Sequence, residues 1–126
     1  MDIVKRVDAL YEALDNSALT DKAELKAEVK CCIDAMMHYF SVVSDQQLRY
    51  LGNSKNKLNI SYMKGIEKLR SESHDDAINA CSRLNEICRK ANVDAVCDFD
   101  PTDRRKVAEF CGLLAGELFF SNLGTH

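Results

Sequence analysis

Two of the three histidines have neighbours that could support acid–base or metal chemistry. His38 lies four residues after Asp34, so a helix would place both on one face, where the carboxylate could orient the imidazole. His74 is followed by Cys81 and Cys88 at intervals of seven, so the three could face one groove. Asp34, His38 and His74 are therefore the candidates for a polar site, although a surface ion pair and a helix cap explain them more simply.

The motifs of the common catalytic and cofactor sites are missing from the sequence. It contains no phosphate-binding Gly-x-x-x-x-Gly-Lys, no Gly-x-Gly-x-x-Gly, no Gly-x-Ser-x-Gly and no His-Glu-x-x-His. It also lacks the Glu-x-x-His pairs of di-iron bundles. We therefore assign no catalytic residue, metal or cofactor and lean against an enzyme. A small metal-dependent enzyme using His38 or His74 is kept as a second alternative.

Six cysteines are many for 126 residues, but their spacing favours packing over chemistry. No pair has the Cys-x-x-Cys spacing of a zinc knuckle or a redox motif. The N-terminal segment lacks the apolar core of a secretion signal, and no apolar run is long enough for a membrane helix. These observations predict a cytoplasmic protein whose reduced thiols pack as small apolar side chains. The six are Cys31, Cys32, Cys81, Cys88, Cys97 and Cys111.

Charge is distributed unevenly along the chain, although the net charge is only −3. Residues 49–70 hold six basic residues and one acid, whereas the segments on either side each carry an excess of four acids. The overall balance excludes a general polyanion binder. The basic middle segment could nevertheless contact a nucleic acid or an acidic partner, and this is our first alternative function. Its candidate binding residues are Lys55, Lys57, Lys64, Lys68 and Arg70.

Apolar residues recur at helical intervals along almost the whole chain, and no segment pairs convincingly as a sheet. The pattern predicts helices over about 2–14, 21–51, 57–70, 74–91 and 101–121, with a loop at 52–56 and a break at 71–73. Whether the second helix is continuous stays open, because a helix of that length would require an extended hairpin or a partner chain. We therefore expect an all-α fold in one domain, 1–126, built as a four- to five-helix bundle or an irregular helical domain.

The last predicted helix is unusually apolar. Asp100 is expected to cap it, and Pro101 is suited to its first turn. Only Glu109 and Glu117 are charged between positions 107 and 120, which predicts a central helix covered nearly all round. A ladder of small residues, Ala108, Gly112 and Gly116, would let another helix approach closely.

The function favoured by these features is a non-enzymatic protein-interaction or regulatory module that self-associates as a homodimer. The long second helix and the apolar last helix offer surfaces that a second copy could cover. Two polar side chains within apolar segments need partners if they are buried: Glu117 is better placed at a surface edge, and Asn85 is a candidate buried contact.

Overall fold

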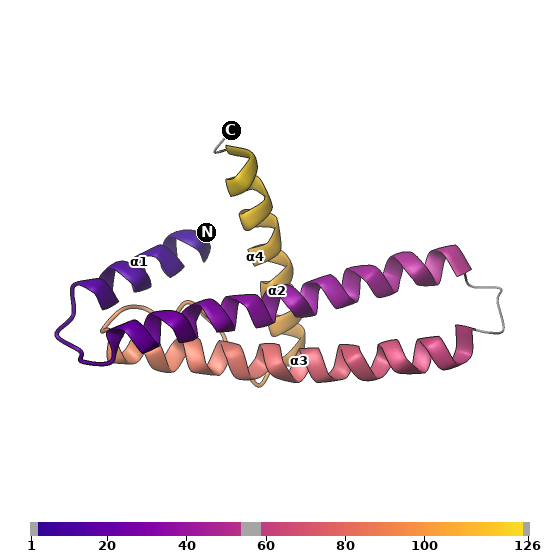
Figure 1. Ribbon diagram of the computed structural model, residues 1–126, viewed down its shortest axis with the longest axis horizontal. Helices are drawn as coiled ribbons and strands as arrows, with labels where there is room; N and C mark the ends of the chain where they lie inside the picture. Colours follow the sequence, from indigo (N-terminus) through magenta and orange to yellow (C-terminus); the bar gives the residue numbers. More distant parts are fainter. Residues whose placement is uncertain (1–2, 54–58, 125–126) are drawn as a thin grey trace.

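The computed structural model describes residues 3–53 and 59–124, which form four α-helices and no strand (Figure 1). The helices are α1 (Ile3–Asp15), α2 (Lys22–Asn53), α3 (Asn59–Lys90) and α4 (Arg104–Gly124). The all-α prediction is confirmed, and the described residues form four helices, where the sequence pattern indicated four or five. None of the helices in the described part of the chain is both long and apolar enough to cross a membrane.

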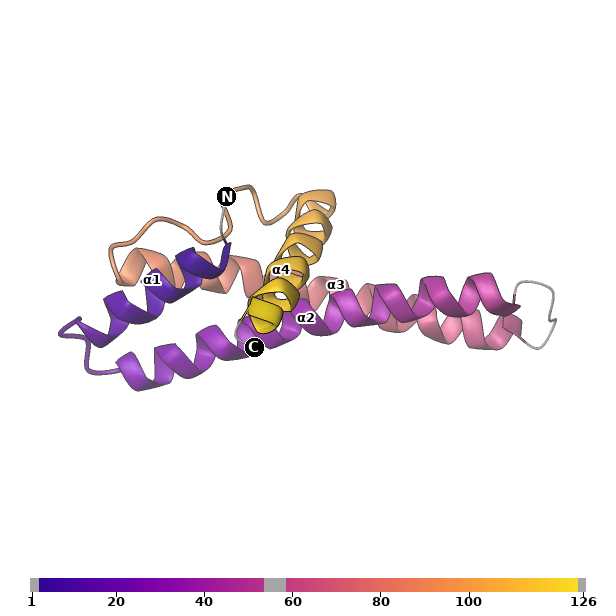
Figure 2. The same cartoon turned by 90° about the horizontal axis from the view of Figure 1, so that it is seen from above.

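The two longest helices, α2 and α3, form an extended antiparallel hairpin. Each has 32 residues, which corresponds to about 48 Å at 1.5 Å per residue. Both views show the two helices side by side over their length (Figures 1 and 2). An ion pair of 2.6 Å between Glu28 of α2 and Arg83 of α3 joins them near the base of the hairpin. The open question about the second helix is thus resolved: it is continuous, and it belongs to an extended hairpin.

The predicted break at 71–73 is wrong, because α3 runs through it without interruption. The polar segment contains neither glycine nor proline, so nothing in it forces the helix to end. Ser73 is buried, and its hydroxyl donates a 3.0 Å hydrogen bond to the carbonyl oxygen of Arg70 one turn earlier. His74 therefore lies in the middle of a helix, and its interpretation as a helix cap is also wrong.

One hydrophobic core includes residues from all four helices. The predicted stripe of α1 is fully buried, and it consists of Ile3, Val7, Leu10 and Leu14. In α2 two adjacent aromatic residues differ in their burial. The structure buries Tyr39, whereas Phe40 is 37% exposed.

An irregular connection, residues 91–103, links α3 to α4. It begins at Asn92, whose φ of 58° lies in the left-handed region that asparagine tolerates. The N–H of Val93 donates to the Cys88 carbonyl at 3.1 Å and that of Asn92 to the Arg89 carbonyl at 3.2 Å. These two bonds are the Schellman pattern that ends a helix.

Two side chains fix the connection against the helices. Asn85 of α3 bonds both backbone groups of Cys97: its amide donates to the carbonyl and its oxygen accepts from the N–H, each at 3.1 Å. Asn85, the candidate buried contact, is half-buried and finds both of its partners in the connection. Arg6 of α1 donates to the carbonyl oxygen of Val96 at 2.7 Å. These bonds set the point from which α4 departs.

The N-cap of α4 is Asp103, not Asp100 as the sequence suggested. The Asp103 carboxylate accepts from the N–H groups of Arg105 at 3.2 Å and Lys106 at 3.3 Å. Asp100 instead accepts from the N–H and hydroxyl of Thr102 and shapes the preceding turn. From this start α4 crosses the hairpin and rises away from it, so that its C-terminal part stands clear of the other helices (Figure 1).

Candidate interaction surface

One face of α4 packs against the rest of the protein. Its residues follow one another at helical intervals and are buried against the other three helices. They are Val107, Phe110, Cys111, Leu114 and Ala115. The ring of Phe110 also contacts Phe99 of the connection, with a centroid distance of 5.3 Å. This face anchors the helix and fixes which residues turn outward.

The opposite face of α4 is apolar but lies in solvent, so the prediction of a helix covered nearly all round is wrong. Leu113 is 64% exposed, Phe119 61% and Phe120 71%. The two phenyl rings contact each other edge to face at 5.7 Å. Three of the five large apolar side chains described as exposed therefore lie on this one helix. A contiguous exposed apolar patch of this kind marks an interaction site in soluble proteins.

Two glycines run through the middle of this outward face. Gly112 and Gly116 are spaced four residues apart, and Phe120 continues the same row. A Cβ added at either glycine would have no described atom within 4 Å outside the helix's own backbone. No other helix in the described part of the chain therefore packs against Gly112 or Gly116. We define the outward face as Gly112, Leu113, Gly116, Phe119 and Phe120.

A hollow of about 380 Å³ borders the outward face beside Leu113. Ile3, Phe99 and Phe110 line it with Leu113, together with five charged residues: Arg6, Asp98, Lys106, Glu109 and Glu117. Glu117 is half-buried, and its Oε1 accepts a 3.1 Å hydrogen bond from the N–H of Val4. The carboxylate thus satisfies a free donor in the first turn of α1, where the helix dipole favours a negative charge.

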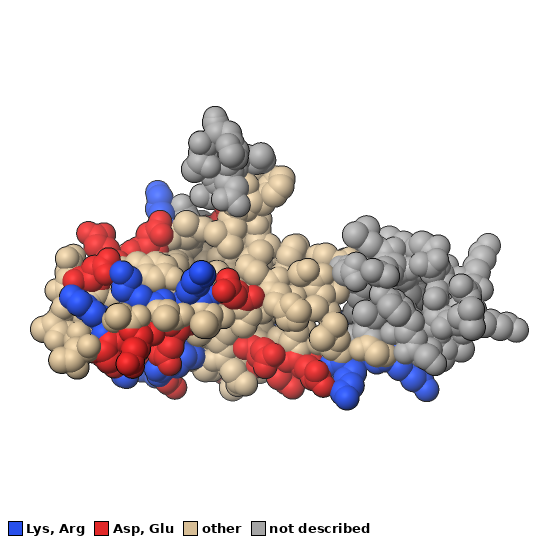
Figure 3. Space-filling model, in the orientation of Figure 1, with Lys and Arg blue, Asp and Glu red and all other residues tan. Residues whose placement is uncertain are grey.

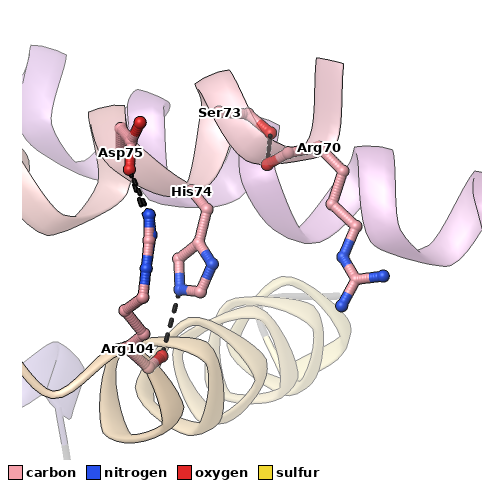
Figure 4. A network of polar contacts seen from close by, with 5 residues as sticks. All are labelled: Arg70, Ser73, His74, Asp75 and Arg104. Atoms are coloured by element: carbon pink, nitrogen blue, oxygen red, sulfur yellow. Dashed lines mark hydrogen bonds and ion pairs between the residues drawn. The ribbon is translucent and has the colours of Figure 1, made fainter. Parts of the chain in front are cut away.

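His74 belongs to a small polar network where α3 meets α4 (Figure 4). Its ring stacks on that of Tyr39 with centroids 4.5 Å apart and an interplanar angle of 16°. Its Nε2 lies 3.0 Å from the carbonyl oxygen of Arg104, to which the N–H tautomer donates. The Arg104 guanidinium pairs with Asp75. The imidazole therefore holds the start of α4 against the hairpin.

The other two candidates for a polar site lie elsewhere. Asp34 and His38 are both exposed on α2, and no hydrogen bond or ion pair between them is present. No described contact brings either of them to His74. Among residues 3–53 and 59–124, no group of three His, Cys, Asp or Glu side chains is arranged to hold a metal ion.

The candidate basic residues are only partly described. Lys55 and Lys57 lie outside the described residues. Lys64, Lys68 and Arg70 are exposed on α3, and Lys68 lies 4.0 Å from Glu72. Arg70 has no carboxylate within ion-pair distance in the described part of the chain, and its guanidinium projects beside His74 (Figure 4). Arg70 and His74 both line a hollow of about 290 Å³, and Arg104 also lines it.

Five of the six thiols pack in the core as the sequence analysis expected, whereas Cys31 does not. All six are free; Cys31 is exposed and the other five are buried. Burial raises the pKa of Cys32 to about 11 and that of Cys111 to about 12. The pKa of Cys97 is raised by its contact with the Cys81 thiol and by burial. Such thiols remain protonated at neutral pH and are poor nucleophiles and ligands.

The sequence named the small residues of the outward face but not its solvent exposure. The signal was available: Leu113, Gly116 and Phe120 share one side of the helix, whereas Phe110 and Leu114 share the other. The sequence could not show how many other helices surround α4.

Comparison with family models, curated proteins and solved structures finds no match for this chain.

Proposed function

We propose that the protein is a non-enzymatic interaction module that acts by self-association through the outward face of α4. The observation that carries the proposal is the exposure of Leu113, Phe119 and Phe120 on a helix segment that stands clear of its own fold. Aromatic residues on a projecting apolar surface are typical anchors of protein interfaces. A second copy of the chain presents the same surface, which is the simplest way to cover it.

The roles of the other reactive side chains support a structural reading. His74 is held between the Tyr39 ring and the Arg104 carbonyl, so its contacts serve the junction of α3 and α4. The raised pKa values of Cys32 and Cys111 make these thiols unreactive at neutral pH. Six unpaired cysteines also favour a reducing compartment, and we propose the cytoplasm.

Sedimentation velocity over a range of protein concentrations tests the proposal. The wild-type chain is expected to shift from monomer to dimer as concentration rises, and the double variant Phe119→Ser/Phe120→Ser to remain monomeric. Phe40→Ser is the matched control, because Phe40 is an exposed phenylalanine on a different helix, α2. Circular dichroism should show the same helix content in all three proteins. A strictly monomeric wild type up to about 1 mM, the range of the weakest specific complexes, would contradict the proposal.

A second candidate function is the binding of an acidic partner or nucleic acid through α3. The specific observation in its favour is Arg70, a guanidinium without a carboxylate partner in the described residues that borders a hollow lined also by Arg104. Phosphate contacts of this kind weaken steeply with salt. Fluorescence anisotropy with a mixed oligonucleotide at low salt should detect binding by the wild type and weaker binding by Arg70→Gln. No binding at low salt would exclude the nucleic-acid form of this candidate.

A further inference from the structure

The outward face of α4 has a pattern of small and large side chains that complements itself. Gly112 and Gly116 leave open space along its centre, and Phe119 and Phe120 project near one end. A projecting ring needs a depression of matching size, and a glycine in a helix surface supplies one. Depression and projection lie on opposite sides of Gly116. A second helix of the same sequence, turned end for end, would therefore bring each ring over a gap.

We infer that two copies of the chain pair through antiparallel α4 helices, with Gly116 of each copy at the twofold axis; this rests on the proposed function. In this register Phe119 of one copy lies over Gly112 of the other, and Phe120 lies beside Leu113, because residues seven apart share one side of a helix. Leu113 lines the 380 Å³ hollow, so the second copy's Phe120 has room to pack. The contact is isologous and closes after two copies.

The distribution of charge favours antiparallel over parallel pairing. On α4 the exposed charges Arg104, Arg105, Lys106 and Glu109 all precede the apolar residues of the outward face, and no charged residue follows Glu117. In the antiparallel register the two Glu109 positions are 14 residues apart along the pair, which is about 21 Å. A parallel pair would instead place each of these charges next to the same residue of the second copy. In the space-filling view the described atoms of the rising part of α4 are mostly tan (Figure 3).

The exposed area indicates a weak dimer. Given the exposed fractions of Leu113, Phe119 and Phe120, the three side chains offer roughly 350 Å² per copy. A standard interface buries about 800 Å² per partner, so these side chains supply nearly half of that. The remainder would come from the walls of the hollow. We expect a dissociation constant in the micromolar range, set mainly by the four phenylalanines, two on each side of the twofold axis.

The variant Gly116→Leu separates association from folding. The structure leaves the Cβ position of Gly116 open, and leucine favours a helix more than glycine, so the isolated chain should fold at least as well. At the twofold axis, however, two leucines would hold the helices apart. We expect the dissociation constant to rise at least tenfold, whereas Gly65→Leu, the matched control on α3 where an added Cβ also meets open space, should change it less than threefold.

Cross-linking then tests the direction of the pair. In a background of Cys31→Ser, which removes the one exposed thiol, Gly116→Cys should give a disulfide-linked dimer under mild oxidation, because the two positions meet at the axis. Glu109→Cys should not, because its two copies are far apart. Efficient cross-linking at both positions would indicate a parallel pair and overturn the inference.

The outcomes also distinguish this inference from the proposed function. A wild type that dimerises while Gly116→Leu leaves the dissociation constant unchanged would show that self-association uses another surface, so only the inference would fail. A wild type that never associates would remove both.

Discussion

Replacing Asn85 by alanine should destabilise the protein by about 2–4 kcal/mol, because the side chain satisfies two backbone groups at once. Its bonds to the N–H and carbonyl of Cys97 are 3.1 Å long, and Cys97 is 1% exposed. Water therefore has no ready access to the groups left behind. Each buried polar group without a partner costs about 1–3 kcal/mol, and partial relaxation of the connection keeps the sum below the maximum.

Urea unfolding followed by circular dichroism measures this loss. Asn79→Ala is the matched control, since Asn79 lies on the same helix but is exposed; its free energy of unfolding should change by less than about 0.5 kcal/mol. All samples need the same protein concentration, because self-association would add to the apparent stability. A loss for Asn85→Ala no larger than that of the control would refute the reasoning. It would mean that the connection is held by its apolar residues alone.

Three further results follow from the structure. Burial raises the pKa of Cys32 from 9.0 to about 11 and that of Cys111 to about 12. The two thiols therefore stabilise the fold below pH 9, and this contribution is lost as the pH rises toward 11 and 12. The free energy of unfolding should fall over that range, and it should fall less in Cys111→Ala. Glu117→Gln should cost about 0.5–1 kcal/mol and speed amide exchange at Val4, because the charge on the α1 N-terminus is lost. Glu72→Pro should cost about 3 kcal/mol or more, measured by thermal unfolding, because α3 is continuous there.

Each of these has a result that would count against it. Equal pH dependence in wild type and Cys111→Ala would mean that the thiol titrates alike in the folded and unfolded chains. Glu109→Gln removes an exposed charge of the same helix, so an equal effect from it would deny Glu117 a capping role. A well-tolerated proline at position 72 would restore the break that the sequence suggested.

The sequence predicted the helices better than their environment. The apolar stripe of α1 was predicted correctly, because four apolar residues at intervals of four, three and four all fall on one face of a helix. The break in α3 was wrong because a run of serine, glutamate and histidine looks the same in a loop and on a solvated helix face. The Ser73 bond to its own helix shows how such a residue is accommodated.

The candidate surface was harder to predict because exposure depends on contacts far apart in the sequence. Apolar residues lie on every side of α4, but only one face of the helix is buried against other parts of the described chain. The role of Asn85 could be anticipated, since an amide within a buried stripe needs a partner. That its partner is the backbone of Cys97, on an irregular segment, could not be derived from any local pattern.

The bond between Glu117 and Val4 joins residues that are 113 positions apart, and Arg6 reaches Val96 across 90. The α2–α3 hairpin needs no such long closure, because its helices are consecutive in the chain. Assembly should therefore have two stages, a rapid one for the hairpin and a slower one in which α1 settles only after α4 has docked. A substitution near either end of the chain should then slow the same late stage, so substitutions at the two ends should lower the refolding rate by similar amounts.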